Sequence, residues 1–135
     1  MPDNLKKLLA EANAVIDTVS VHDALTQVDD PRVLLVDVRE TAERQNNGVI
    51  PGAVHVPRGF LEFIADPNGP MHNEAMVSGR KLLLFCATGG RSTLATKTLM
   101  DMGFVDVAHI AGGFSAWREA GGPIELTEPS SQNAG

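Results

Sequence analysis

Two runs of apolar residues dominate the hydrophobic pattern of the chain. Residues 33–36 read Val-Leu-Leu-Val, and residues 81–85 continue from a lysine into Leu-Leu-Leu-Phe. Uninterrupted apolar runs of this length are typical of strands that are covered on both faces. We therefore predict two central strands at these positions, and further strands over residues 18–21, 53–56 and 105–110.

Helical spacing occurs between these predicted strands. Near the N-terminus, Asn4 stands as a candidate helix cap before apolar residues at helical intervals, which are Leu5, Leu8, Leu9, Ala12 and Val15. An amphipathic helix is predicted over residues 93–102, closed by Gly103. Shorter helical segments are predicted over residues 23–25, 41–45, 61–65, 71–78 and 114–120, with a loop over 66–70. Strands that alternate with helices predict an α/β fold, in which a mostly parallel sheet carries helices on both faces.

The length of 135 residues suits one compact domain. We expect an N-terminal helical extension over residues 1–17, the folded domain over 18–126, and a flexible C-terminal tail over 127–135, where the chain becomes polar. The formal net charge of -6 argues against a nucleic acid or an acidic membrane as partner, because both call for a basic face. No segment is long and apolar enough to span a bilayer.

The expected location is the cytoplasm. Residues 1–7 lack the apolar segment of a secretory signal. The chain has one cysteine, Cys86, which cannot form an intramolecular disulfide, so nothing in the sequence points to an oxidising compartment.

Cys86 is the most informative residue for function. It follows the predicted strand 81–85 directly, and ligand sites of parallel sheets lie at the carboxyl ends of the strands. A helix is predicted to begin a few residues later, and a helix N-terminus offers partial positive charge and free N–H groups. Such surroundings lower the pKa of a cysteine and make it a nucleophile. We therefore predict that Cys86 is catalytic and that an anion site is formed by the residues after it, which are Ala87, Thr88, Gly89, Gly90, Arg91 and Ser92.

Within this segment each residue type has an expected role. Gly89 and Gly90 let the backbone curl without a Cβ penalty. Arg91 supplies a cation, and hydroxyl donors to the same anion are expected from Thr88, Ser92 and Thr93.

Several of these candidates also have a purely structural interpretation. Cys86 can be a small buried apolar residue at a strand end, and Arg91 can form a surface ion pair. Arg58 follows a proline in a loop after another strand, where it either binds an anionic donor or is solvated. Asp37 and Arg39 are expected to be structural, capping and pairing around the loops.

The remaining chemistry-bearing residues are expected to have no catalytic role. Trp117 and Phe114 are predicted to pack in the core. No metal-ligand spacing occurs among the four histidines, which are His22, His55, His72 and His109. No glycine motif for a nucleotide is present either. We therefore predict no cofactor and no metal.

Five short motifs, in this order and spacing, give the chain a resemblance to a known family. They are Asp37-Val38-Arg39, Gly48-Val49-Ile50-Pro51-Gly52-Ala53, Val56-Pro57-Arg58-Gly59, Cys86-Ala87-Thr88-Gly89-Gly90-Arg91-Ser92 and Gly112-Gly113-Phe114-Ser115-Ala116-Trp117. With them the chain resembles the single-domain rhodaneses (sulfurtransferases) from about residue 19 to 124. One departure is Val49, which stands where the family often has histidine. We expect a structural consequence there rather than a loss of activity.

The resemblance implies a single rhodanese-like domain with a five-stranded sheet, in which the catalytic cysteine opens the loop over a helix N-terminus. It further implies a ping-pong reaction. The Cys86 thiolate takes the sulfane sulfur of thiosulfate or a similar donor and becomes a persulfide, from which an acceptor removes the sulfur. The implied partners are small molecules such as thiosulfate, cyanide or thiols, or a sulfur-accepting protein. Because the chain has no second cysteine, the acceptor must be external.

Two alternatives remain open at this stage. A cysteine phosphatase or arsenate reductase uses a related loop but usually places arginine six positions after the cysteine, whereas Arg91 follows Cys86 by five. The shorter loop favours a pocket for one sulfur atom over a pocket for a tetrahedral oxyanion. The other alternative is a non-catalytic or regulatory binding module with the same fold, since a fold alone does not establish activity.

Overall fold

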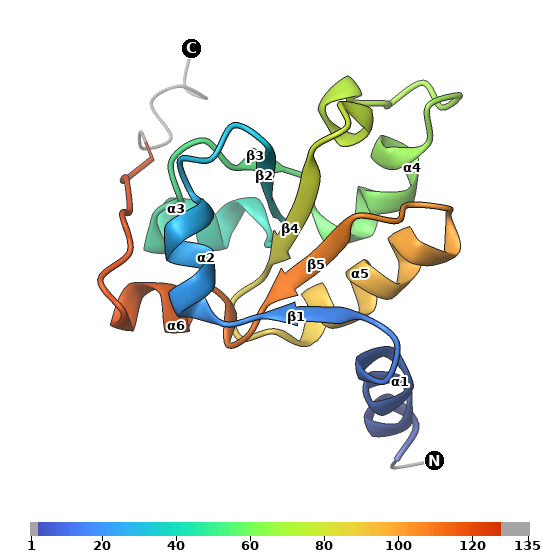
Figure 1. Cartoon of the computed structure of the whole chain (residues 1–135), viewed down its shortest axis with the longest axis horizontal. Helices are drawn as coiled ribbons and strands as arrows, with labels where there is room; N and C mark the ends of the chain where they lie inside the picture. The colour runs from blue at the N-terminus through green and yellow to red at the C-terminus, as the bar shows by residue number, and fades with distance from the viewer. Residues whose placement is uncertain (1–2, 128–135) are drawn as a thin grey trace.

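A parallel β-sheet forms the centre of the computed structural model, which describes residues 3–127 (Figure 1). Its strand order is β1-β5-β4-β2-β3, and every neighbouring pair is parallel. The strands are β1 (Asp17–Val19), β2 (Val33–Asp37), β3 (Val54–His55), β4 (Lys81–Phe85) and β5 (Val107–Ile110). The predicted five-stranded α/β fold is therefore confirmed.

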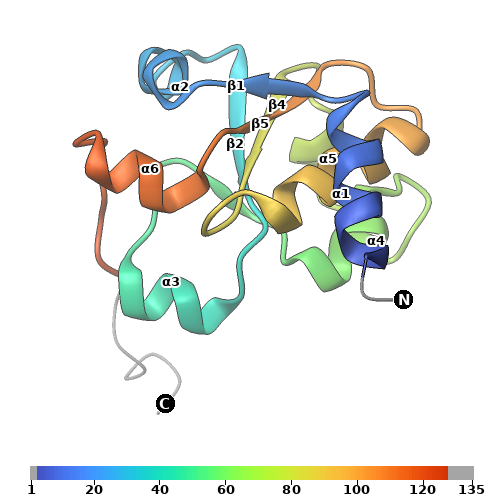
Figure 2. The ribbon, with the colours of Figure 1, turned by 90° about the horizontal axis from the view of Figure 1, so that it is seen from below.

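Helices connect these strands and cover both faces of the sheet (Figure 2). The α-helices are α1 (Asn4–Asn13), α2 (Val21–Gln27), α3 (Thr41–Asn47), α4 (Leu61–Ala65), α5 (Gly90–Asp101) and α6 (Gly113–Glu119). Two short 3-10 helices, η1 (Arg58–Phe60) and η2 (Glu74–Val77), flank α4 along the chain. No helix in residues 3–127 is long and apolar enough to cross a membrane.

The core lies on both faces of the sheet because β2 is apolar from Val33 to Val36 and β4 from Leu82 to Phe85. In β2, Leu34 and Val36 face the layer of α4 and α5, while Leu35 faces the layer of α2 and α6. The second layer also buries Phe114 and Trp117, so the predicted core role of this pair is confirmed. Burial of apolar area stabilises the fold by roughly 25 cal/mol per Å². Because the central strands are buried on both faces, they form a rigid base for the loops that follow their carboxyl ends.

Several element boundaries differ from those that the sequence predicted. Helix α1 begins at Asn4 with Asp3 as its N-cap, so Asn4 is not the cap. Strand β1 ends at Val19, because the Ser20 side chain accepts a hydrogen bond from the Asp23 N–H at 3.1 Å and starts α2 at the next residue.

Two predicted helices also have different lengths. Within the predicted segment 71–78, only the short 3-10 helix η2 forms, and the Asn73 side chain caps it. Helix α5 begins three residues before the predicted start, at Gly90. By contrast, α4 and β4 have the predicted bounds, and Gly103 has the positive φ of a helix-ending glycine.

The predicted domain limits are only partly within the described residues. Helix α1 lies in the predicted extension 1–17, whose last residue already belongs to β1. Apart from Thr127, the predicted tail 127–135 lies outside the described residues. Val49, the departure from the family pattern, pairs its backbone with Glu125 at 2.8 and 2.9 Å. Those bonds do not depend on the side chain, and the expected consequence of Val49 stays a prediction.

Candidate active site

Cys86 lies at the carboxyl end of β4, directly before the turn into α5. The side chain is buried, with 1% of the residue exposed. The residues that follow it, Ala87 to Gly89, form a short loop, and Gly89 is the N-cap of α5. The strand and the helix thus hold the sulfur at the helix N-terminus, as the sequence predicted.

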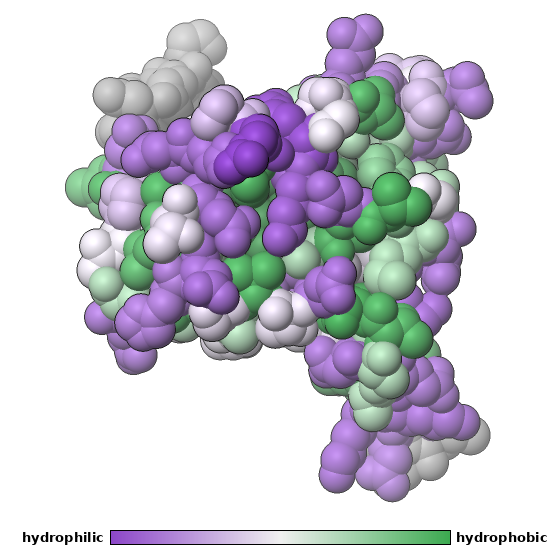
Figure 3. All heavy atoms as spheres, viewed as in Figure 1, coloured by the Kyte–Doolittle hydropathy of each residue, from purple (hydrophilic) through white to green (hydrophobic). Residues whose placement is uncertain are grey.

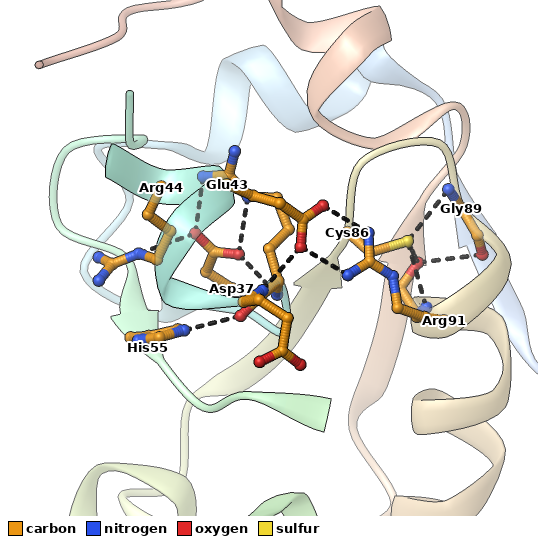
Figure 4. A network of polar contacts seen from close by, with 10 residues as sticks. Asp37, Glu43, Arg44, His55, Cys86, Gly89 and Arg91 are labelled. Atoms are coloured by element: carbon orange, nitrogen blue, oxygen red, sulfur yellow. Dashed lines mark hydrogen bonds and ion pairs between the residues drawn. The ribbon is translucent and has the colours of Figure 1, made fainter. Parts of the chain in front are cut away.

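Three groups lie around the Cys86 sulfur (Figure 4). The Gly89 N–H donates to Sγ at 3.1 Å, and the Ser92 N–H donates at 3.4 Å. The thiol itself donates to Ser92 Oγ at 3.6 Å, and once the thiol has lost its proton the hydroxyl can reverse this contact. Burial acts to raise the pKa of Cys86, but the hydrogen bonds from Ser92, Gly89 and Thr88 outweigh it, so the pKa is lowered.

Gly89 is the residue on which this loop geometry depends. Its φ of 118° and ψ of -16° lie in a region that side chains rarely adopt. Its carbonyl accepts hydrogen bonds from Thr93 Oγ1 at 2.7 Å and from Ser92 Oγ at 3.2 Å. The expectation that Thr93 donates to the anion was therefore wrong, because its hydroxyl is used to close the first turn of α5. Gly90 was also expected to let the loop backbone curl. That expectation was wrong, since Gly90 is helical and its φ is not positive.

Helix α6 supports the loop through two backbone hydrogen bonds. The Phe114 N–H donates to the Cys86 carbonyl at 2.8 Å, and the Ser115 N–H donates to the Ala87 carbonyl at 3.0 Å. Gly113 makes this approach possible, since a Cβ there would lie 2.5 Å from the Cys86 carbonyl oxygen. The glycine pair before α6 thus has a direct structural link to the cysteine.

His109 is a functional candidate that sequence reasoning missed. From β5, its Nδ1 lies 2.9 Å from Ser92 Oγ, which in turn contacts Cys86. Its Nε2 is buried and has no hydrogen-bond partner among the described residues. Burial lowers the pKa of His109 and keeps the ring neutral. If Nδ1 carries the proton and donates to Ser92, the Ser92 hydroxyl keeps its own proton, which can go either to the Gly89 carbonyl or to the sulfur.

Arg91 points toward Glu43 of helix α3 (Figure 4). Its two terminal nitrogens donate to the two carboxylate oxygens at 2.7 Å each. The hydrogen bonds between Arg91 and Glu43 are the main reason why the pKa of Glu43 is lowered to about 2. They also raise the pKa of Arg91, and the nearby charge of Cys86 raises it further. The ion-pair interpretation of Arg91 thus holds, and its partner was not foreseen. Glu43 also closes the capping box of α3 with Glu40, which fixes the carboxylate in place.

Asp37 and Arg39 form a buried ion pair beneath α3, which supports the structural role predicted for them. Arg39 Nη2 donates to Asp37 at 2.9 Å and to the Gly48 carbonyl at 2.9 Å, and its guanidinium stacks on Phe114 at 4.1 Å. Arg44 of α3 donates to the same aspartate at 3.2 Å. The pair therefore connects β2 to both α3 and α6.

Arg58 is not brought to the cysteine loop. It contacts Glu62 at 3.2 Å and Thr98 at 3.3 Å, and it does not line the hollow at Cys86. Its anion-binding role stays a prediction.

A hollow of about 270 Å³ opens onto Cys86. Thr88, Gly90 and Arg91 line it from the loop side, and Leu94 lines it from α5. The opposite side comes from α1, through Leu5 and Leu9. No group of side chains that could hold a metal ion occurs in the described part of the chain. The hollow therefore brings together a cysteine sulfur, the backbone of the loop and an apolar wall.

Comparisons with known proteins give relatives of similar length. A model of the rhodanese-like domain matches residues 20–120. The chain is 33% identical over 113 residues to a sulfurtransferase of Allochromatium vinosum, covering 84% of this chain and 95% of that protein. It is 36% identical over 132 residues to thiosulfate sulfurtransferase 16, chloroplastic, of Arabidopsis thaliana, covering 87% of this chain and 99% of that protein. A solved structure from Rhodopseudomonas palustris is described as a protein of unknown function and possible tyrosine phosphatase. It is 44% identical to this chain with a TM-score of 0.88, and the match covers 90% of this chain and 94% of that one.

Proposed function

The chain belongs to the rhodanese-like domain family, and on that premise we propose that it is a sulfurtransferase that carries sulfane sulfur as a persulfide on Cys86. The observation that carries the proposal is the set of donors on Sγ. Two backbone N–H groups and one hydroxyl lie within 3.6 Å of the sulfur, and they favour its anionic form. The persulfide anion carries the same charge one atom further out, toward the hollow.

The proposed first step moves one sulfur atom between two anions. The Cys86 thiolate attacks the outer sulfur of thiosulfate, a new S–S bond forms to Sγ, and the original S–S bond breaks with its electron pair on the departing sulfite. Cys86 becomes a persulfide anion, so charge and atoms balance without a proton or a redox partner. In the second step a thiophilic acceptor such as cyanide or a thiol, or a sulfur-accepting protein, takes the terminal sulfur.

The roles we propose for the loop follow from the contacts. Ala87 and Thr88 supply backbone to the turn, and Gly89 and Ser92 hold the sulfur. Gly90 and Arg91 line the entrance to the hollow. Anion binding by Arg58 stays a proposal, at a position outside the hollow of Cys86, and the cytoplasm is the proposed compartment of this chain.

A cysteine phosphatase is the second candidate, because the Rhodopseudomonas palustris protein carries that description. The loop argues against it for this chain. Arg91 follows Cys86 by five positions rather than the usual six, which leaves a shorter loop than those phosphatases use. Both terminal nitrogens of Arg91 are bonded to Glu43. A binding module without catalysis would not need three donors on a cysteine sulfur.

Exposure of the protein to thiosulfate tests the proposal. Intact-protein mass spectrometry is expected to show one added sulfur, which cyanide removes, and Cys86→Ser is expected to show none. Ser92→Ala is expected to move the pH profile of sulfur loading to higher pH, because a donor that lowers the pKa of Cys86 is gone. The exposed Ser115→Ala serves as control.

The outcomes separate the candidates. Absence of an adduct with thiosulfate and with every other sulfane donor, on a thiol that still reacts with iodoacetamide, would overturn the sulfurtransferase proposal. Hydrolysis of p-nitrophenyl phosphate that disappears in Cys86→Ser would instead support the phosphatase.

A further inference from the structure

Helix α1 lies outside the residues that match the family model, yet it reaches the candidate active site. The family match begins at residue 20, and α1 ends at Asn13. The helix packs beside α5 (Figure 2), whose N-terminus carries the cysteine loop. Two of its side chains, Leu5 and Leu9, line the hollow that contains Cys86.

The leucines of α1 line two different hollows. Leu5 and Leu9 are one helical turn apart and share one face. Leu8 lines a different hollow, together with Lys7 and Glu11. The side of α1 that is turned to the viewer in Figure 3 is mainly hydrophilic. The apolar stripe formed by Leu5 and Leu9 is therefore directed at the hollow of the cysteine loop.

Burial against the body of the protein accounts for only part of this stripe, since Leu9 is half-buried and Leu5 is exposed. Leu5 is 60% exposed, although it stands beside a hollow. Burying apolar area stabilises by roughly 25 cal/mol per Å². A ligand that covers Leu5 gains this free energy on binding. Leu94 of α5 adds a third leucine to the same wall.

We propose that α1 forms an apolar subsite of the sulfur-transfer site and that this subsite selects a sulfur donor with a compact hydrocarbon group. The proposal rests on the sulfurtransferase function proposed above. The hollow of about 270 Å³ holds roughly nine water molecules at their liquid volume, more room than a thiosulfate ion needs. The donor's anionic sulfur faces the Cys86 loop and Arg91, while its organic group lies against Leu5, Leu9 and Leu94.

Benzenethiosulfonate is a probe of this class. The Cys86 thiolate attacks its outer sulfur, a new S–S bond forms to Sγ, and the S–S bond to the sulfonyl group breaks with its electron pair on benzenesulfinate. One persulfide anion and one sulfinate anion form from two anions, so no further reactant is needed for this step. The product on Cys86 is the same as with thiosulfate, so a difference between the donors reports on the phenyl group.

The test is the ratio of kcat/KM for benzenethiosulfonate to kcat/KM for thiosulfate, with cyanide as acceptor. Leu5→Ser is expected to lower this ratio about five- to tenfold, the loss for one partly covered leucine. Leu5→Met, which restores apolar area, is expected to recover most of it. Leu8→Ser removes the same side chain from a different hollow, which Cys86 does not line, and is expected to leave the ratio unchanged. Equal ratios in wild type and Leu5→Ser would overturn the subsite.

A second readout does not require sulfur transfer. Because Cys86 is the only cysteine of the chain, its alkylation by N-benzylmaleimide and by iodoacetamide can be followed by mass spectrometry. Leu5→Ser is expected to slow the first reagent relative to the second, whereas Leu8→Ser is not. If wild type transfers sulfur from neither donor, the proposed function fails, and the alkylation ratio still decides the subsite. A ratio unaffected by Leu5→Ser overturns the subsite even where both donors react.

Discussion

Gly89→Ala and Gly90→Ala place the same methyl group on neighbouring residues, and we expect opposite effects on stability. Gly89 has a φ of 118°, outside the conformations that alanine adopts without strain. Gly90 is the first residue of α5 and has no positive φ, and among residues 3–127 no neighbouring atom lies within 4 Å of the point that a Cβ would occupy. The pair therefore separates the cost of the loop conformation from the general cost of replacing a glycine.

The magnitudes follow from the two conformations. A residue forced into a sparsely populated backbone region costs about 1–3 kcal/mol, so Gly89→Ala is expected to destabilise by that amount. Gly90→Ala is expected to stabilise by about 0.4–1 kcal/mol, because it restricts the unfolded chain without strain in the folded one. With an entropy of unfolding near 2.1 cal/mol/K per residue, Gly89→Ala is expected to lower Tm by roughly 4–11 °C, and Gly90→Ala is expected to raise it by roughly 1–4 °C.

Thermal unfolding followed by circular dichroism measures both shifts, and sulfur loading of Cys86 measures the chemical consequence. If Gly89→Ala relaxes its backbone to avoid the strain, its N–H leaves Sγ, so loading is expected to require a higher pH than in wild type. Equal Tm values for the two variants, together with an unchanged pH profile of loading, would refute the assignment of Gly89 as the residue that holds the loop.

Two further substitutions probe the ion pairs around the loop. Arg39→Met leaves the Asp37 carboxylate buried with Arg44 as its remaining cation, and we expect a loss of about 3 kcal/mol in chemical denaturation, against no measurable loss for the exposed Arg32→Met; similar values for both would contradict a buried structural pair. Glu43→Gln is expected to flatten the dependence of Tm on pH. Since Arg91 lowers the pKa of Glu43 from 4.5 to about 2, the contribution of this pair is full above pH 4.5 and is lost as pH falls toward 2; parallel curves in that window would contradict it.

The sequence was sufficient for the central sheet because local and long-range requirements agree there. The runs at 33–36 and 82–85 are apolar at every position, so any fold that buries them gives strands covered on both faces. The segment 71–78 is different, since its helical pattern competes with the Asn73 side chain, which caps a 3-10 turn instead. Such short-range competition between side chain and backbone is hard to decide from spacing alone.

The position of Cys86 could also be predicted, because a strand end and a helix start are both local features. Its partners could not, since they come from other elements. Glu43 reaches Arg91 from α3, across 48 positions of sequence, and nothing in either residue's neighbourhood selects the other. The pairing follows from strand order, which places β2 and the helix after it beside β4.

His109 marks the limit of this kind of prediction, and it also shows which signal was available. The register of β4 and β5 sets His109 opposite Leu84, and alternation along β5 places it with Val107 on the face of α5. A histidine inside a buried strand must find a hydrogen-bond partner, because burying an unpaired polar group is costly. That requirement is readable in the sequence, whereas the identity of the partner, Ser92, depends on the way α5 returns across the sheet. A polar residue in a buried strand next to a candidate nucleophile's strand is therefore a reason to suspect a contact with the site, even where no motif includes it.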